Sequence, residues 1–311
     1  MARSMTEMEN LREGALTGIR VIDLTRILAG PFCTMLLADM GAEVIKIESP
    51  SGGDAVRSQG IIRNGMSWYF AQFNRNKKSV TLDLYSDEGK NKLAALLKDA
   101  DILVENFRPG VLAKMGFGKD YLDTLNPGLI VASVNGYGST GPYTDRPSFD
   151  FIAQAMSGFM SVTGEADGAP MRAAPPMADL IAGLYCAFGA VTALNSRNRS
   201  GKGQYVETSL TNSLISLMAF LSADYFAGGE VPARSGNNHA IVAPYGLFKA
   251  KDGAIAVAPS NDTYVERFLG AVGLEHLLVD DRFRTNADRM RNRPALLKII
   301  DAVTELHSVD Y

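Results

Sequence analysis

Short apolar runs alternate with stretches of helical spacing along the first half of the chain. The runs are rich in β-branched residues, which is typical of strands buried on both faces of a sheet. They are Ile19–Leu24, Ala42–Glu48, Ser79–Leu84, Ala100–Glu105 and Leu129–Val134. Between them, Phe32–Met40 and Asp87–Lys98 carry apolar residues at helical spacing. Because alternating strands and helices favour parallel pairing, the sequence predicts an α/β fold with a large Rossmann-like parallel-sheet domain.

The pattern changes in the last third of the chain. The apolar stretch Thr208–Phe226 contains no glycine and predicts a long helix that links two domains. After it, Pro244–Ala258 has the alternation and central turn of a β-hairpin. The sequence therefore predicts a large domain at residues 1–205, a helical linker at 206–234 and a small α+β domain at 235–311.

Composition narrows the classes of partner and compartment. The 311 residues carry a net charge of -3, and their basic residues are scattered among acids, which disfavours nucleic acid as a partner. Cys33 and Cys186 both fall in apolar helical patterns and read as buried thiols of a reducing compartment. The three histidines lack metal-ligand spacing, so no metal site is expected. The N-terminus lacks the apolar core of a secretory signal, and no run reaches about 18 apolar residues, so we expect a cytoplasmic protein without a membrane partner.

Asp179 stands where a proline-stiffened segment gives way to a long apolar helix. Pro175 and Pro176 disfavour helix before it, and the apolar pattern runs on to Asn195. One interpretation is an N-cap aspartate that stabilises the helix by about 1 kcal/mol. The other is a nucleophile, a carboxylate kept ionised by the helix terminus that attacks an activated carbonyl. The residues alone leave both interpretations open.

Two basic residues follow the strand that ends at Glu105. Arg108 and Lys114 predict a phosphate site there, because open α/β sheets bind ligands at the carboxyl ends of their strands. The loop Gly136–Tyr143 is too rich in glycine and proline for a regular element and is expected to bind or cover a ligand. The chain has no GxGxxG after a strand, so a dinucleotide is not indicated.

Several segments, together covering almost the whole chain, resemble the class III CoA-transferases, the family of the formyl-CoA and carnitine CoA-transferases. Besides the Asp179 helix, the matching segments are LAGPFCTMLLADMGAEVIKIE, NRNKKSVTLDL, ENFRPGVLAKMGF, NGYGSTGPYTDRPSFDFIAQAMSG, SGKGQ and GNNHAIVAPYGLFKAKDG. Seven segments in register make a chance match very improbable.

The resemblance implies substrates, site residues and assembly. It implies acyl-CoA and a carboxylic acid as substrates, no permanently bound cofactor, and an interlocked homodimer. Asp179 matches the nucleophile, and Asp150 matches an acidic position near it. The positions implied to contact CoA are Ile27, Leu28, Ala29, Leu82, Asn106, Phe107, Arg108 and Lys114, the last two through its phosphates.

Some positions depart from the pattern. Ser49 replaces an arginine that stacks on adenosine in some relatives, and Leu28 replaces the glutamine of formyl transferases, which argues against that substrate. The sequence DYFAGGE, Asp224–Glu230, is shared with the carnitine-type enzymes. The C-terminal segment that returns to the large domain in the family is expected to be absent from this chain.

The chemistry implied is transfer of CoA through covalent acyl and CoA adducts on Asp179. Backbone N–H groups of Ser235–Ala243 are candidates for stabilising the oxyanion, at about 3 kcal/mol each, although this loop also fits an ordinary interdomain turn. Two alternatives remain. Racemases of the same fold use a histidine before the Asp150 position, where this chain has Phe149, and a non-catalytic CoA-binding protein needs no nucleophile.

Overall fold

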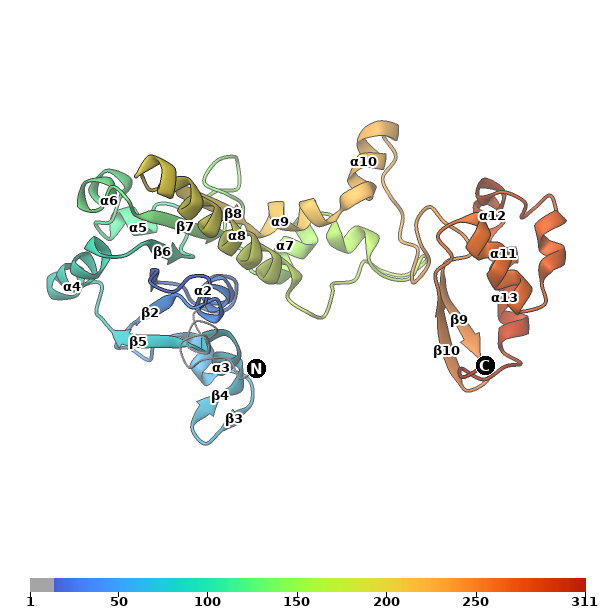
Figure 1. Cartoon of the computed structure of the whole chain (residues 1–311), viewed down its shortest axis with the longest axis horizontal. Helices are drawn as coiled ribbons and strands as arrows, with labels where there is room; N and C mark the ends of the chain where they lie inside the picture. The colour runs from blue at the N-terminus through green and yellow to red at the C-terminus, as the bar shows by residue number, and fades with distance from the viewer. Residues whose placement is uncertain (1–13) are drawn as a thin grey trace, which may run out of the picture. The chain divides into compact units, whose positions relative to one another are not determined.

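The computed structural model describes residues 14–311 and divides the chain into two compact units (Figure 1). The larger unit holds the described residues up to Phe159 together with Ala173–Ala227. The smaller unit holds Met160–Arg172 and Gly228–Tyr311. The segment predicted not to be a secretory signal falls mostly on residues 1–13, outside the described part.

A six-stranded parallel sheet forms the centre of the larger unit. Its strands are β1 (Arg20–Asp23), β2 (Glu43–Glu48), β5 (Lys77–Thr81), β6 (Ile102–Glu105), β7 (Ile130–Asn135) and β8 (Tyr205–Ser209). Their order is β5-β2-β1-β6-β7-β8, the doubly wound order in which the chain starts at the centre and reverses direction between β1 and β6. The predicted α/β fold with a Rossmann-like parallel sheet is confirmed.

Successive residues of the central strands enter two separate cores. Val21 of β1 packs with α2 (Ala29–Asp39) and α8 (Met177–Ser200), whereas Ile22 packs on the opposite face with α4 (Asp87–Lys98) and α6 (Lys119–Leu125). Both side chains are fully buried. This two-sided burial explains why the strands are apolar without alternation.

Helix α8 packs closely on α2. A Cβ on Gly183 would lie 2.4 Å from the carbonyl oxygen of Ala29, so the absence of a side chain permits this contact. The helix starts two residues before Asp179 and runs on to Ser200, past the expected end at Asn195, where Gly201 closes it at φ 69°. By length and apolar composition alone α8 is able to cross a membrane, but the same description fits a core helix, and eight of its residues are buried in this unit.

The stretch predicted as one linker helix has three elements. Strand β8 pairs with β7, and Ser209 then caps α9 (Leu210–Leu217) by accepting a hydrogen bond from the Asn212 N–H at 3.3 Å. A break at Ala219, φ 48°, separates α9 from α10 (Ala219–Gly228). The structure groups these elements with the larger unit, whereas the predicted boundary at 205 cuts through β8. Hydrophobic periodicity does not show which domain these elements belong to, because edge strand β8 is followed directly by an apolar helix.

The predicted strand Ser79–Leu84 is displaced in the structure. The observed β5 begins at Lys77, whose ammonium group donates to Asp23 Oδ2 at 3.1 Å, and ends at Thr81. A buried lysine marks the start of this strand, so hydrophobicity alone placed it too far along the chain.

The smaller unit contains an antiparallel hairpin and helices, as an α+β arrangement requires. Strands β9 (Gly246–Ala250) and β10 (Gly253–Val257) pair across the predicted turn. Helices α11 (Asp262–Ala271), α12 (Asn286–Arg291) and α13 (Arg293–Thr304) pack with them around a core that includes Phe248 and Leu296.

Replacing Gly183 tests the α2–α8 contact. Gly183→Ala should lower the free energy of unfolding by roughly 1–3 kcal/mol, because the new methyl group has no room against the Ala29 carbonyl. The matched control is Gly270→Ala in α11, where the nearest atom, Glu275 Cγ, lies 3.9 Å from the added Cβ. That change should raise stability by about 0.5–1 kcal/mol. Urea unfolding of both variants measures this, and equal stabilities would contradict the close contact.

Candidate active site

A cavity of about 720 Å³ opens at the carboxyl ends of β1 and β6, where the strand order reverses. This is the place at which doubly wound sheets bind ligands. The turn Thr25–Ile27 leaves β1 here, and Asn106, Phe107 and Arg108 follow β6. The wall is completed by the loop before α7 (Asp150–Met156) and by the first turn of α8.

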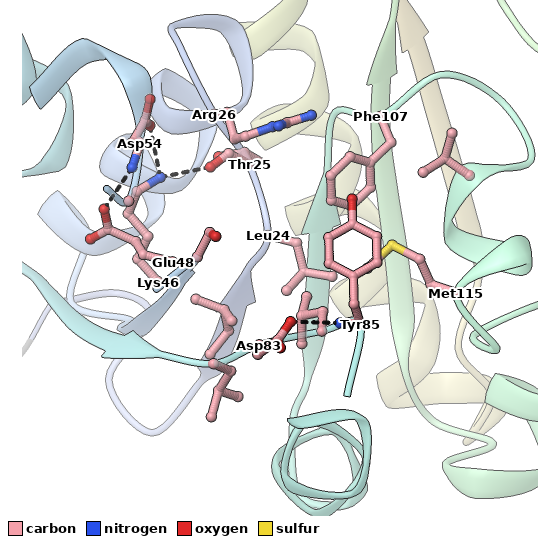
Figure 2. Close-up of a pocket in the computed structure, with 16 residues that line it drawn as sticks. Leu24, Thr25, Arg26, Lys46, Glu48, Asp54, Asp83, Tyr85, Phe107 and Met115 are labelled. Atoms are coloured by element: carbon pink, nitrogen blue, oxygen red, sulfur yellow. Dashed lines mark hydrogen bonds and ion pairs between the residues drawn. The ribbon is translucent and has the colours of Figure 1, made fainter. Parts of the chain in front are cut away.

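Most of the predicted site residues meet in this cavity. The predicted residues that line it are Ile27, Leu28, Ala29, Asn106, Phe107, Arg108 and Asp179. Leu82 instead lines a neighbouring cavity of about 160 Å³, which shares Arg26, Gly53 and Phe107 with the larger one (Figure 2). Lys114 is exposed at the end of α5 (Val111–Lys114) and lines neither of these cavities.

Asp179 is the third residue of α8 and is half-buried in the cavity wall. Within residues 14–311 its carboxylate has no hydrogen-bond or ion-pair partner, so it does not cap the helix. The pKa of Asp179 is raised from 3.8 to about 7, first because burial removes water from the carboxylate and then because the charge of Asp150 repels it. These surroundings disfavour the charged carboxylate, contrary to the expectation that the helix terminus keeps it ionised.

Asp150 takes the capping role from outside the helix. Its Oδ1 accepts the N–H of Ala178 in the first turn of α8 at 2.8 Å, and its Oδ2 accepts from the Gln154 side chain at 2.8 Å. Gln154 in turn accepts the N–H of Ala173 at 2.8 Å. These bonds hold the approach to α8. They show that the N-cap interpretation of Asp179 is wrong, and the capping residue was not visible in local sequence because it is 28 residues from its partner Ala178.

The face of α8 that carries Asp179 is also the face that contacts α2. Asp179 and Gly183 are four residues apart and so lie on one face, one turn from each other. Since Gly183 lies against the carbonyl of Ala29, the packing brings Asp179 towards the N-terminal turn of α2. The Asp179 carboxylate and a helix N-terminus therefore share one cavity wall.

Helix α2 begins with backbone donors that have no partner. Within the described chain no acceptor reaches the N–H groups of Leu28 and Ala29, and Pro31 contributes none. Both residues line the cavity. Free N–H groups at a helix start favour negative charge, which is what a thioester carbonyl develops when a carboxylate attacks it.

The loop Ser235–Ala243 offers fewer donors than expected. The N–H groups of Gly236, Asn238 and His239 donate to the carbonyls of Gly164, Ser235 and Tyr245 at 3.0–3.1 Å. The N–H of Ala243 donates to the Asn286 side chain at 3.2 Å. These four N–H groups are thus paired within the smaller unit, whereas those of Leu28 and Ala29 at the start of α2 are unpaired within the described chain.

Two arginines in the cavity wall were missed in the sequence. Arg26 lies with its guanidinium 5.4 Å from the centre of the Phe107 ring, and Arg146 lies 4.3 Å from that of Tyr143. Arg26 follows directly after the first strand, and that position was the available signal. Asn106, expected to contact CoA, uses its amide to accept the Arg26 N–H at 2.9 Å and to donate to the Arg26 carbonyl at 2.8 Å.

The raised pKa of Asp179 predicts a pH-dependent stability difference. The folded protein favours the protonated carboxyl, so this contribution to stability is present below about pH 4 and is lost as the pH rises through about 7. At pH 8, Asp179→Asn should therefore unfold at a higher temperature than the unchanged protein. The gain in the free energy of unfolding should be roughly 2 kcal/mol, less than the full pKa shift implies, because the side chain is partly exposed to solvent. The gain should shrink at pH 5. Melting curves at both pH values decide this, with the exposed Asp167→Asn as the control for one lost charge; a gain independent of pH would contradict it.

The sequence is similar to those of known CoA-transferases. Succinate–glutarate CoA-transferase of Agrobacterium fabrum is 39% identical over 307 residues, which cover 96% of this chain and 76% of that protein. Acetyl-CoA:oxalate CoA-transferase of Acetobacter aceti is 39% identical over 285 residues, which cover 91% of this chain and 73% of that protein.

A solved structure shares the fold. A CAIB/BAIF family protein from Brucella suis superposes with a TM-score of 0.84 at 38% identity, over 96% of this chain and 80% of the other. The family model for CoA-transferase family III matches residues 16–311. The chain belongs to the class III CoA-transferase family.

Proposed function

We propose that this protein transfers CoA from an acyl-CoA thioester to a carboxylic acid through covalent adducts on Asp179. The observation that carries this is the charge inventory of the larger cavity. Among the described residues that line it, Asp179 is the single acid, and three arginines, Arg26, Arg108 and Arg146, line the same cavity. An unpartnered carboxylate in a cationic cavity suits attack on an anionic thioester.

The reaction balances without any further group. A carboxylate oxygen of Asp179 attacks the thioester carbon, the C–S bond breaks, and CoA leaves as a thiolate from a mixed anhydride. The thiolate then attacks the aspartyl carbonyl carbon, which releases the donor acid and leaves an aspartyl-CoA thioester. The acceptor carboxylate attacks that thioester and expels the thiolate, which finally attacks the acceptor's acyl carbon and frees Asp179. With a pKa of about 7, a large share of Asp179 is ionised at neutral pH and ready for the first step.

The residues that line the two cavities suit different parts of an acyl-CoA. The N–H groups of Leu28 and Ala29 supply stabilisation for the oxyanions of each step. The smaller cavity, with Leu82, Tyr85 and Phe107 in its wall (Figure 2), has the apolar and aromatic character that an adenine ring needs. Arg26 lies between the two cavities, where a diphosphate would pass.

We propose dicarboxylic acids as the substrate class. The two relatives described above are named for three dicarboxylic acids, succinate, glutarate and oxalate, and the second is named for acetyl-CoA as well. With Arg26 and Arg108 assigned to the phosphates of CoA, Arg146 is the remaining arginine that lines the larger cavity, and its charge favours a substrate with a second carboxylate. Phe149 lines the same cavity and cannot accept a proton, which disfavours racemisation.

Incubation with succinyl-CoA alone tests the covalent step. Because the first half-reaction needs no acceptor, hydroxylamine should convert an Asp179 adduct into a hydroxamate, seen as a mass change on the peptide that contains this residue. Asp179→Asn should give no adduct and no transfer to glutarate. Solvent deuterium entering the succinyl group without an adduct would point to a racemase instead, and CoA binding without either result would point to a binding protein.

Arg108 and Lys114 form a matched pair for the phosphate site. Arg108→Ala should raise the KM for succinyl-CoA about tenfold with little change in kcat, because binding common to the ground and transition states is lost. Lys114→Ala removes a nearby charge that lines neither cavity and should change KM far less. Steady-state kinetics at several salt concentrations compare them. Equal effects of the two changes would remove Arg108 from the phosphate site.

A further inference from the structure

Two buried charges lie beside the turn that leaves β1. Lys46 and Asp54 have exposed fractions of 1% and 2%, and Lys46 Nζ lies 3.1 Å from Asp54 Oδ2 (Figure 2). A buried ion pair is by itself weak support for stability, since removing both charges from water has a high cost. The other contacts of the pair therefore matter more than the pairing.

The pair forms hydrogen bonds with both ends of the turn Thr25–Ile27. Lys46 Nζ donates to the carbonyl of Thr25 at 2.6 Å, as Figure 2 shows. The carboxylate of Asp54 accepts the N–H of Ile27 at 3.2 and 3.3 Å. Together with the bonds of Asn106 to Arg26, these contacts bind the backbone of the turn from two sides.

Ile27 needs such a hold. Its φ of 71° lies in the left-handed region, where a β-branched residue is a strained outlier. Strain of this kind persists only when neighbouring groups determine the conformation. The bond to Asp54 contributes to this. Because packed helix α2 fixes the chain that follows, rotation about the N–Cα bond of Ile27 would turn its N–H away from the buried carboxylate.

Asp54 is itself fixed from β2. Its own N–H donates to Glu48 Oε2 at 3.0 Å. Arg57 donates to both oxygens of Glu48 at 2.7 and 2.6 Å, and Ser79 donates to Oε1 at 2.6 Å. Strand β2 thus fixes the backbone of Asp54 through Glu48 and its carboxylate through Lys46.

We propose that Asp54 is a positioning residue, which holds Ile27 in the left-handed conformation so that the N–H groups of Leu28 and Ala29 face the cavity that contains Asp179. The proposal rests on the transferase function proposed above. Asp54 contacts none of the reacting atoms. Its effect should therefore fall on turnover more than on CoA affinity.

A double-mutant cycle tests this. Asp54→Asn should lower kcat for succinyl-CoA and glutarate by about tenfold, while the Kd for free CoA, measured by calorimetry, stays within about threefold. In the Ile27→Gly background the same Asp54→Asn change should have a clearly smaller effect, because glycine adopts positive φ without steric cost. A purely structural role for Asp54 would give the same loss in both backgrounds and overturn the proposal.

Two controls separate other causes. Asp39→Asn removes an exposed carboxylate, paired with Arg75, at the far end of α2 and should leave turnover unchanged. If Asp54→Asn fails to fold, Glu48→Gln takes its place, because it loosens Asp54 while keeping the pair with Lys46.

The conformation of Ile27 gives a readout that does not depend on activity. A crystal structure of the Asp54→Asn protein should show that Ile27 has left φ near 71°. If the unchanged protein neither binds CoA nor transfers it, the proposed function is wrong. The crystal structure of the variant would still show whether Asp54 holds Ile27 in its left-handed conformation. A retained φ near 71° would refute the positioning role whatever the kinetics.

Discussion

The contact between α2 and α8 is the constraint on which the site depends. Gly183 lets the two helices approach until only a backbone carbonyl separates them. That approach places Asp179, one turn earlier on the same face, at the cavity where α2 begins. Any side chain at position 183 would separate the carboxylate from the backbone donors. One missing Cβ therefore links the packing of the larger unit to its chemistry.

The electrostatics of the unit fall into two zones. Among the buried groups of the sheet, cations and anions neutralise each other, and Lys77 pairs with Asp23. Burial alone would raise the pKa of Asp23. The charges of Lys77 and Lys46 and the hydrogen bonds from two threonines outweigh burial and lower this pKa to about 2. In the cavity wall, Asp179 has no such partner, and its pKa moves the opposite way. Paired acids hold the backbone in place, and the unpaired acid remains available for reaction.

Sequence patterns predicted what burial and chain order determine. The apolar runs gave the central strands correctly, because a residue such as Val104 is apolar for the same reason that it is buried. Seven of the site residues that the family resemblance implied line one cavity in the structure. Local patterns could not reveal Lys46 or Asp54, since polar residues are expected at the surface and only tertiary structure shows that these are buried. The interpretation of Asp179 as a cap remained open for a related reason: the residue that caps the helix, Asp150, is remote in sequence.

The separation of Asp150 and Asp179 has an evolutionary consequence. Asp150 caps the first turn of α8, whereas Asp179 makes no bond on which that turn depends. Replacement of the residue at 179 would then be tolerated by folding while it removes the proposed nucleophile. A lineage that needed only to bind a CoA ester could lose catalysis here in a single step and keep the scaffold intact. Because one aspartate caps the helix and the other does not, binding proteins without catalytic activity could arise easily from this fold.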